Sequence, residues 1–203
     1  YRVMIAYSSP LHAPISPPLG HIMMSDVARF PDWPRHISAM ARSNGVILRD
    51  YQHPQRAVLA AQMAALCRAQ GRPFWVAGDA ALANKLSAGF HCPSYLIPRR
   101  PQFAVTSPLP ATAAVHHMRQ IQQAAEAGFQ MVLLSPAFTT NSHVGAASWG
   151  PVRFMQLARA AAERGLLVYA LGGMTQNNWQ RLNGAHHLLS GYAAIGDFQD
   201  HGQ

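Results

Sequence analysis

The sequence predicts an α/β fold, a compact (β/α)8 barrel preceded by an irregular, proline-rich N-terminal leader. Short apolar runs alternate with longer amphipathic runs from Leu19 onward. The short runs are apolar throughout, which is typical of parallel strands that helices cover. Eight such runs occur, and eight parallel strands close into a TIM barrel, for which 203 residues is near the lower limit of about 200. An open, doubly wound sheet of fewer strands is the competing interpretation.

The N-terminal residues differ in composition from the rest of the chain. Four prolines fall within residues 8–18, and little in this stretch can pack into a core. We therefore expect residues 1–18 to form an irregular leader and residues 19–203 to form a single barrel domain. The apolar run at residues 2–7 is too short for a secretory signal. Two cysteines are too few for a disulfide framework, so a reducing cytoplasm is the expected location.

The first half of the chain contains three strands and three helices with clear boundary signals. Proline suits the first turn of the first helix, and Gly71 stops the second. Asp79 is an N-cap for the third helix, which we expect to end at Leu86. The strands are predicted at residues 21–25, 46–49 and 74–77, and the first two helices at residues 34–42 and 54–70.

The second half repeats this rhythm. Strands are predicted at residues 90–92, 103–106, 131–135, 166–171 and 192–195. Helices are predicted at residues 113–127, at residues 151–164, and from the cap Thr175 to residue 183. The stretch between the fourth and fifth strands is polar and broken by proline, so the helix that a regular barrel has there is expected to be missing or degenerate.

The charge pattern and the length of the apolar runs argue against two classes of partner. The formal net charge is +8, but the arginines are scattered through every segment and Lys85 is the only lysine. Nucleic-acid-binding proteins cluster their cations on one face, so we expect no nucleic-acid partner. No apolar run approaches the roughly 18 residues that a membrane span needs, so we expect no membrane partner. The sequence leaves open whether the barrel forms a homodimer.

Glycines follow two of the last predicted strands. Active sites of α/β barrels lie at the carboxyl ends of the strands, and the loops after strands seven and eight commonly hold a phosphate. Gly172 and Gly173 come after the seventh strand and Gly196 after the eighth. Glycines at such places let backbone N–H groups close around an anion. The pattern therefore predicts a phosphorylated small molecule as ligand, with a simple tight turn as the structural alternative.

The loop after the sixth predicted strand, residues 135–146, is long and rich in hydroxyl groups. Long loops in compact domains are often functional. Its Thr140, Ser142 and His143 supply hydroxyl and imidazole groups that bind phosphate without a lysine. The alternative is a surface loop whose hydroxyls cap the following helix.

The stretches that follow the predicted strands resemble, in order, those of thiamine phosphate synthase and its relative, the thiazole tautomerase TenI. Ser-Pro-Ala-Phe at 135–138 and the loop to residue 145 resemble the family's Gly-Pro-Val-Phe and Thr-x-Thr-Lys loop. Ala-Leu-Gly-Gly-Met at 170–174 resembles Ala-Ile-Gly-Gly-Ile, and Gly-Tyr-Ala-Ala-Ile at 191–195 resembles a Gly-Val-Ala-Val strand. Upstream, residues 46–51 resemble Val-Gln-Leu-Arg-x-Lys and residues 89–93 resemble Gly-Val-His-Leu-Gly. Residues 19–198 are thus identified as a divergent member of this family.

The resemblance implies a barrel that joins hydroxymethylpyrimidine pyrophosphate to a thiazole phosphate and releases pyrophosphate. Such an enzyme stabilises the departing pyrophosphate electrostatically, usually with Mg²⁺ and cations. Arg49 matches the family's pyrophosphate arginine, and Thr140 and Ser142 keep the loop hydroxyls. The residues that match the family's thiazole-phosphate cradle are Gly172, Gly173, Ile195 and Gly196.

Most family positions that handle Mg²⁺ and pyrophosphate are altered here. The family's glutamine, lysine, Asn-Asp pair and second aspartate are replaced by Ile47, Tyr51, Ala77 with Gly78, and Ser94. Asp79 is then the nearest carboxylate for Mg²⁺, and His143 stands in place of the loop lysine. The monophosphate end of the site is thus retained while the metal and pyrophosphate end is changed.

Three hypotheses follow. In a divergent synthase, Arg49, Asp79 and His143 take over the lost roles, with Mg²⁺ held at Asp79. In a tautomerase-like enzyme, no metal is needed and one acid/base group suffices, supplied by His116 or His117 where the family has Ser-x-His. The prediction of a strand at residues 103–106 competes with this, because it buries both histidines in the following helix. In the third hypothesis, the chain is a noncatalytic protein that binds a phosphate ligand.

Overall fold

The strands form a closed barrel, as the sequence predicts, rather than an open sheet. The computed structural model describes residues 19–99, 107–138, 150–185 and 187–195. Each strand pairs in parallel with the next, and β8 pairs with β1. The strands are β1 (Ile22–Met24), β2 (Gly45–Leu48), β3 (Phe74–Ala77), β4 (Gly89–Cys92), β5 (Thr112–Val115), β6 (Met131–Leu134), β7 (Leu167–Leu171) and β8 (Gly191–Ile195).

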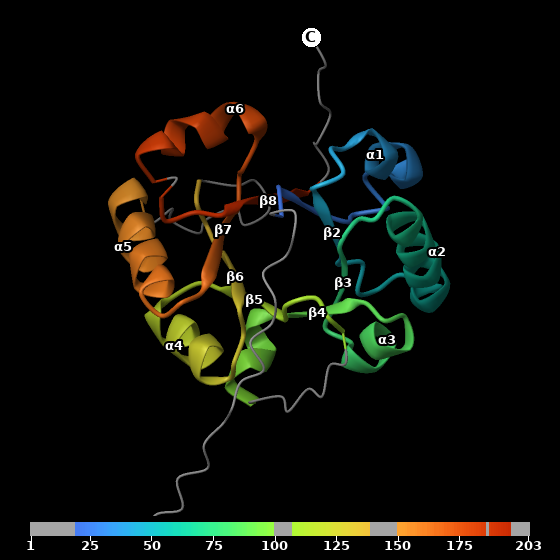
Figure 1. The fold of residues 1–203 in the computed structure, drawn as a ribbon, viewed down its shortest axis with the longest axis horizontal. Helices are drawn as coiled ribbons and strands as arrows, with labels where there is room; N and C mark the ends of the chain where they lie inside the picture. The colour runs from blue at the N-terminus through green and yellow to red at the C-terminus, as the bar shows by residue number, and fades with distance from the viewer. Residues whose placement is uncertain (1–18, 100–106, 139–149, 186, 196–203) are drawn as a thin grey trace, which may run out of the picture.

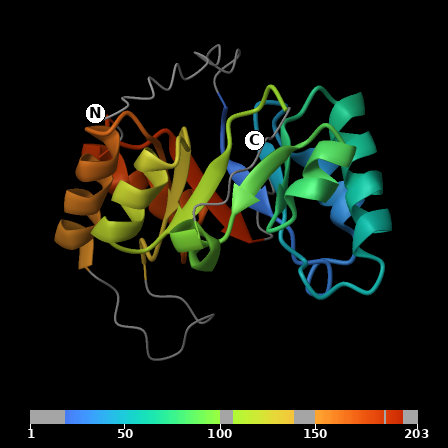
Figure 2. The same cartoon turned by 90° about the horizontal axis from the view of Figure 1, so that it is seen from below.

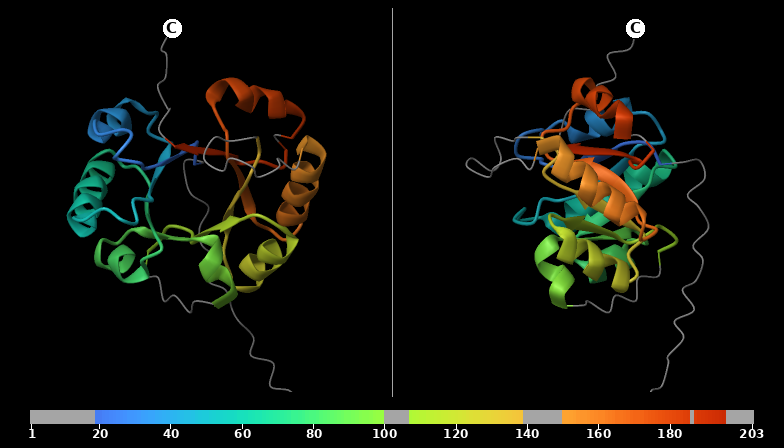
Figure 3. Two further views of the ribbon diagram at one scale, coloured as in Figure 1. Left: turned by 180° about the vertical axis from the view of Figure 1, so that it is seen from behind. Right: turned by 90° about the vertical axis from the view of Figure 1, so that its left-hand side faces the viewer.

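Helices surround this barrel (Figure 1), and α4 and α5 lie side by side on its outside (Figure 3). In the described part of the connection between β4 and β5, the 3₁₀ helix η1 stands where a missing or degenerate helix is predicted. No helix among the described residues is long and apolar enough to cross a membrane. The helices are α1 (Trp33–Ala39), α2 (Arg56–Ala69), α3 (Ala80–Lys85), η1 (Ser94–Arg99), α4 (Met118–Glu126), α5 (Gly150–Ala162), α6 (Gln176–Trp179) and η3 (Gln180–Ala185).

Alternation along the strands divides the buried side chains into two layers. On β2, Val46 and Leu48 belong to the large cluster between the barrel and the helices, while Ile47 belongs to the cluster inside the barrel. The strands are buried on both sides because helices cover the outer face and side chains fill the inner one. This double burial explains why the strand sequences are apolar throughout.

Two aromatic rings fill the barrel interior toward the amino ends of the strands, and glycines on neighbouring strands leave space for them. Trp75 is fully buried, and its indole Nε1 donates to the carbonyl oxygen of Pro110 at 2.9 Å. A Cβ at Gly89, on the neighbouring strand, would overlap this indole. Tyr169 is placed in the same way against Gly191. The barrel is therefore a packed core at this level.

The helix predicted at residues 113–127 is wrong at its start, because the fifth strand of the barrel lies there. β5 is Thr112–Val115 and pairs with β4 and β6. The strand predicted at residues 103–106 lies outside the described residues. Helix α4 begins only at Met118, after the N-cap His117. Alanine is a strong helix former, so Thr-Ala-Ala-Val ahead of an amphipathic run reads as helix, although burial inside a barrel decides in favour of a strand. His116 therefore follows a strand instead of lying in a helix.

Candidate active site at the carboxyl ends of the strands

The carboxyl ends of the strands form the solvent-accessible end of the barrel interior. Arg49, Ala114, His116, Leu171 and Ile195 follow the inward-facing alternation of their strands and are partly exposed. Inward-facing residues nearer the amino ends of the strands, by contrast, are almost completely buried. The loops after β1 and β2 extend from the same end of the barrel (Figure 2). A small molecule from solvent can therefore contact these side chains.

Arg49, a predicted catalytic residue, lies directly after β2 and is held by the end of β1. Its guanidinium Nη2 donates to the Asp26 carboxylate at 3.3 Å, and its backbone N–H donates to the Ser25 hydroxyl at 2.8 Å. The Arg49 side chain is 36% exposed. Arg29 also approaches the Asp26 carboxylate, at 3.9 Å. The positive charge of Arg49 is thus partly offset, but its guanidinium remains accessible to an anion.

Asp50 ties the loops after β1 and β2 together. Its carboxylate accepts a short hydrogen bond from the Ser25 hydroxyl and a second one, at 2.8 Å, from the backbone N–H of Val27. The Ser25 hydroxyl also accepts a hydrogen bond from the backbone N–H of Arg49. It therefore bridges the Arg49 backbone and the Asp50 carboxylate. Asp50 therefore fixes the backbone from which Arg49 projects, although the sequence does not single it out.

Asp79, the predicted metal ligand, is the N-cap of α3. Its Oδ1 accepts the backbone N–H of Leu82 at 2.9 Å, which satisfies one of the unpaired donors of the helix start. Its Oδ2 lies 3.9 Å from Nη1 of Arg56. The capping prediction is confirmed, and both carboxylate oxygens face nitrogen groups of the chain itself.

Arg56 is a second guanidinium at this end of the barrel, and no sequence pattern pointed to it. It lies in the first turn of α2, and its side chain, 15% exposed, donates through Nε to the carbonyl oxygen of Asp50 at 3.1 Å. Its Nη2 donates to the carbonyl oxygen of Ala77 at 2.6 Å. Arg56 thus links the ends of β2 and β3, beside the Tyr51 ring, which stands at the position of the family's lysine.

The described residues contain no preformed cluster of metal ligands. Magnesium prefers an octahedral set of oxygen ligands that includes at least one carboxylate. Within the described ranges, no group of three or more His, Cys, Asp or Glu side chains is placed to hold a metal ion. Asp79, the predicted ligand, is engaged by the start of α3 and by Arg56.

His116 lies at the end of β5, next to Ser135 at the end of β6. Its Nδ1 is 3.0 Å from the Ser135 hydroxyl and 3.2 Å from the Ser135 carbonyl oxygen. Its backbone N–H donates to the Gln120 side chain at 2.7 Å, which joins it to the first turn of α4. His117, by contrast, is exposed and caps α4 by accepting the N–H of Gln120. The structure thus separates the two histidines, and His116 is the one at the barrel opening.

The glycines after β7 adopt the backbone conformations that require glycine. Gly172 has φ = 93° and Gly173 has φ = 64°, in the left-handed region that other residues rarely adopt. A Cβ at Gly172 would lie 3.1 Å from Cα of Pro136. The carbonyl oxygen of Gly172 accepts the N–H of Phe138 at 3.0 Å, which holds the start of the loop after β6 against the end of β7.

Ile195, the last predicted cradle residue that can be placed, ends β8 and pairs with Met24 of β1. Four further predicted site residues lie outside the described residues: Thr140, Ser142, His143 and Gly196. The described part of the site therefore contains Arg49, Asp79 and His116 together with Gly172, Gly173 and Ile195.

His91 is a buried histidine inside the barrel. It is 1% exposed, and its Nδ1 is 2.7 Å from the Thr112 hydroxyl on the neighbouring strand. Burial lowers the pKa of His91 from 6.5 to about 4, because the charged form loses its solvation. His91 is therefore neutral near pH 7 and acts as a packed, hydrogen-bonded core group.

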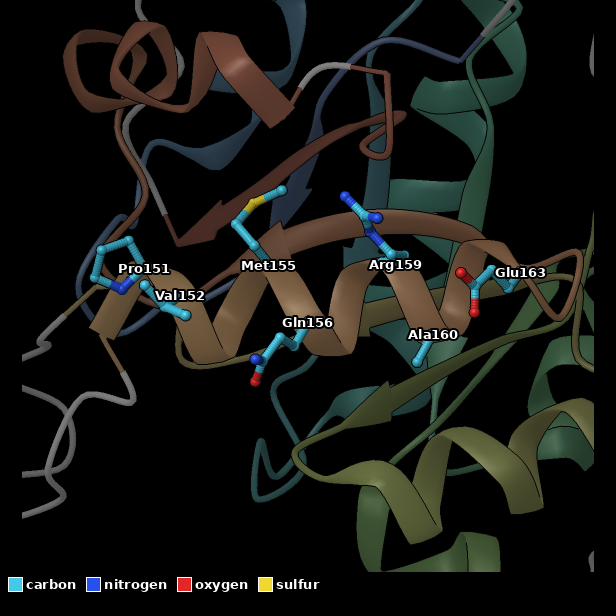
Figure 4. A pocket seen from close by; sticks show the side chains of 7 residues that line it. All are labelled: Pro151, Val152, Met155, Gln156, Arg159, Ala160 and Glu163. Carbon is cyan, nitrogen blue, oxygen red and sulfur yellow. The ribbon is translucent and has the colours of Figure 1, made fainter.

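A groove of about 560 Å³ runs along the exposed face of α5 (Figure 4). None of the site residues that the structure describes lines it, and the opposite face of this helix packs against the barrel through Phe154 and Ala158. The groove is thus separate from the carboxyl ends of the strands. The residues that line it are Pro151, Val152, Met155, Gln156, Arg159, Ala160 and Glu163.

Comparison with protein families identifies the chain. A family model described as thiamine monophosphate synthase matches residues 34–196, which is more than half of the sequence. The chain belongs to the thiamine monophosphate synthase family. This confirms the resemblance that the sequence motifs indicate, and members of this family bind phosphorylated thiamine precursors. No curated protein sequence matches the chain.

Solved structures share the fold of this family member. Thiamine phosphate pyrophosphorylase from Pyrococcus furiosus superposes with a TM-score of 0.68 at 17% identity, covering 87% of this chain and 85% of that one. The citrate synthase SbnG matches with a TM-score of 0.56 at 10% identity, over 88% and 86% of the two chains. A mandelate racemase/muconate lactonizing enzyme from Jannaschia sp. CCS1 matches with a TM-score of 0.57 at 13% identity, over 88% and 55%. At these identities the likeness shows the barrel fold alone.

Proposed function

We propose that this family member binds a phosphorylated thiazole at the carboxyl end of the barrel and catalyses a metal-independent proton shift within it, as a thiazole tautomerase does. The observation that carries the proposal is the position of His116, whose imidazole is held by Ser135 at the barrel opening. The predicted metal ligand, Asp79, is meanwhile engaged as a helix cap. A proton shift needs one positioned acid/base group and no metal.

The phosphate of the ligand is proposed to bind between the ends of β7 and β8. Barrels commonly hold a phosphate there because backbone N–H groups of glycine-containing loops can converge on an anion. The left-handed conformations of Gly172 and Gly173 support this place. The proposed binding residues are Gly172, Gly173, Ile195 and Gly196, with the hydroxyls of Thr140 and Ser142.

His116 is the proposed acid/base group. It takes a proton from one atom of the conjugated ring system and returns it to another, so the enzyme ends the turnover unchanged. His143 is proposed to donate a hydrogen bond to the ligand, as a neutral imidazole in place of the family's lysine. Arg49 is proposed to bind an anionic group of the ligand through its accessible guanidinium.

The second candidate function is the synthase reaction, in which a thiazole phosphate displaces pyrophosphate from a pyrimidine. Two guanidiniums favour it, because Arg49 follows β2 and the side chain of Arg56 reaches from α2 to the end of β3. In this reaction they would stabilise the leaving pyrophosphate directly. The carboxylate partners of both arginines, Asp26 and Asp79, oppose this role by reducing the net positive charge.

Three broader proposals accompany this function. We propose that residues 19–203 form one barrel domain and that residues 1–18 are a leader without a role in catalysis. The proposed partner is a phosphorylated small molecule, with no nucleic acid and no membrane, and the proposed location is the cytoplasm. A homodimer is also compatible with these proposals, and sedimentation equilibrium distinguishes it from a monomer.

The experiment follows both binding and turnover. Thermal unfolding is measured with thiazole phosphate, hydroxymethylpyrimidine pyrophosphate and Mg²⁺ added separately, and a ligand at about 100 times its Kd stabilises by ~2.7 kcal/mol. Stabilisation by thiazole phosphate is expected without Mg²⁺. Tautomerisation is followed by NMR in wild type, in His116→Asn and in the matched control His117→Asn, which keeps a capping residue on α4.

The outcomes separate the candidates. Loss of tautomerisation in His116→Asn alone supports the proposal. Release of pyrophosphate that depends on Arg49 and Arg56 supports the synthase. Binding of thiazole phosphate without either reaction leaves a noncatalytic binding protein, and no binding contradicts the proposal.

A further inference from the structure

Two acceptor atoms of Ser135 converge on one nitrogen of His116. Nδ1 lies 3.0 Å from the hydroxyl oxygen and 3.2 Å from the carbonyl oxygen of this residue. The N–H of Ser135 donates to the carbonyl oxygen of Val115 at 3.1 Å. This bond continues the β5–β6 pairing and places Ser135 opposite His116. Ser135 is 8% exposed, so its orientation is fixed by its surroundings.

The carbonyl contact assigns the imidazole tautomer. A carbonyl oxygen only accepts hydrogen bonds, whereas a hydroxyl both donates and accepts. An unprotonated Nδ1 would place its lone pair against that of the carbonyl oxygen, so both contacts are satisfied together only when Nδ1 carries the proton. The lone pair that takes up a proton is then the one on Nε2.

We propose that Ser135 is a positioning residue for His116: its carbonyl oxygen keeps the proton on Nδ1, and its hydroxyl is a second acceptor that stabilises the imidazolium. This inference rests on the proposed function for its catalytic part. Nε2 takes a proton from the substrate, and the electron pair of the broken bond enters the conjugated ring system. The imidazolium then returns the proton from Nε2 to another atom of the same system.

The Ser135 hydroxyl has no counterpart at the same place in the family motifs. In the motifs that the sequence resembles, glycine stands before the proline and serine two residues before the histidine, and this chain has Ser135 and Ala114 at these places. Ala114 and Ser135 lie on the adjacent ends of β5 and β6. The hydroxyl beside the histidine is thus supplied by the neighbouring strand.

The test uses ¹⁵N NMR of the histidine rings in the full chain, with the His116 signals assigned from their loss in His116→Asn. In wild type, the neutral His116 ring is expected to carry its proton on Nδ1. Ser135→Ala removes the hydroxyl and keeps the carbonyl, so the proton is expected to stay on Nδ1, and the Nδ1 shift is expected to change because this nitrogen loses one of its two acceptors. Ser135→Thr keeps the hydroxyl and is expected to retain the wild-type shifts.

Turnover gives the second readout. Loss of one hydrogen bond to the imidazolium is expected to lower kcat about threefold to tenfold, with KM within about twofold of wild type because the substrate still binds. Ser135→Thr is expected to restore kcat. A structural role alone would lower stability without moving the ring-nitrogen shifts or separating kcat from KM.

The two proposals fail in different ways. A neutral His116 protonated on Nε2 in wild type, or ring shifts unchanged in Ser135→Ala, overturns the role of Ser135. The expected shifts without tautomerisation overturn the proposed function and leave the positioning of His116 by Ser135 intact. If Ser135→Ala does not fold, the pair Ser135→Gly with Ala114→Ser replaces it, and recovery of the wild-type shifts there supports the proposal.

Discussion

At the scale of single residues, the hydrogen bonds of Asp79 decide between a helix cap and a metal ligand. Replacing a capping aspartate by alanine costs about 1 kcal/mol, and serine keeps most of the cap. We therefore expect Asp79→Ala to lose about 1 kcal/mol in the free energy of urea unfolding and Asp79→Ser to lose less. Mg²⁺ is expected to leave all three proteins unchanged. Stabilisation of wild type by Mg²⁺ that disappears in Asp79→Ala would instead identify a metal site.

A single methyl group at Gly89 tests the packing inside the barrel. Because a Cβ there overlaps the buried indole of Trp75, Gly89→Ala forces that ring to move and is expected to cost about 1–3 kcal/mol. Gly71→Ala is the matched control, since its Cβ meets open space and only its left-handed backbone is strained. Near-UV circular dichroism of tryptophan is expected to change in Gly89→Ala and not in Gly71→Ala. The same spectrum in both variants would contradict the packing argument.

At the scale of elements, Asp50 joins two loops that carry the site. Its carboxylate accepts from the Ser25 hydroxyl and the Val27 N–H, and both donors are left without this acceptor in Asp50→Ala. We expect a loss of about 1–3 kcal/mol, the cost of unsatisfied polar groups. Asp32→Ala is the control, because Asp32 stands at the start of α1 without a side-chain capping bond. Equal unfolding free energies for the two variants in urea would show that Asp50 does not hold the loops.

Sequence reasoning succeeds for elements whose burial and boundary signals agree. Phe74–Ala77 is predicted with its observed bounds because an apolar run is followed by a glycine and a cap. The strand Thr112–Val115 is missed because its small residues also suit a helix and only closure of the barrel decides between them.

The site is predicted less completely than the fold. Gly172 and Gly173 are found because they follow the seventh predicted strand, where barrel loops commonly hold a phosphate, and His116 is found through a family motif. Arg56 is missed, because its guanidinium reaches back from α2 to the carbonyl oxygen of Ala77, a contact 21 residues apart in sequence. Likewise, the pairing of Ser135 with His116 depends on the register of two strands rather than on either motif.

At the scale of the whole molecule, the buried His91 links the stability of the barrel to pH. Its pKa is about 4 in the folded chain and about 6.5 in an unfolded one. Between these values the unfolded chain binds a proton that the folded chain does not, so stability falls as pH drops through this window and is fully retained above it.

This linkage predicts a loss of about 2 kcal/mol from His91 alone between about pH 7 and about pH 5. The glutamine in His91→Gln is neutral at both pH values. The free energy of urea unfolding is therefore expected to fall by about 2 kcal/mol less in this variant than in wild type between these two pH values. The difference between wild type and His91→Gln isolates His91, because the two proteins share every other titratable group. An unchanged pH dependence in His91→Gln would mean that the barrel interior admits the charged imidazole, and with it enough water to solvate that charge.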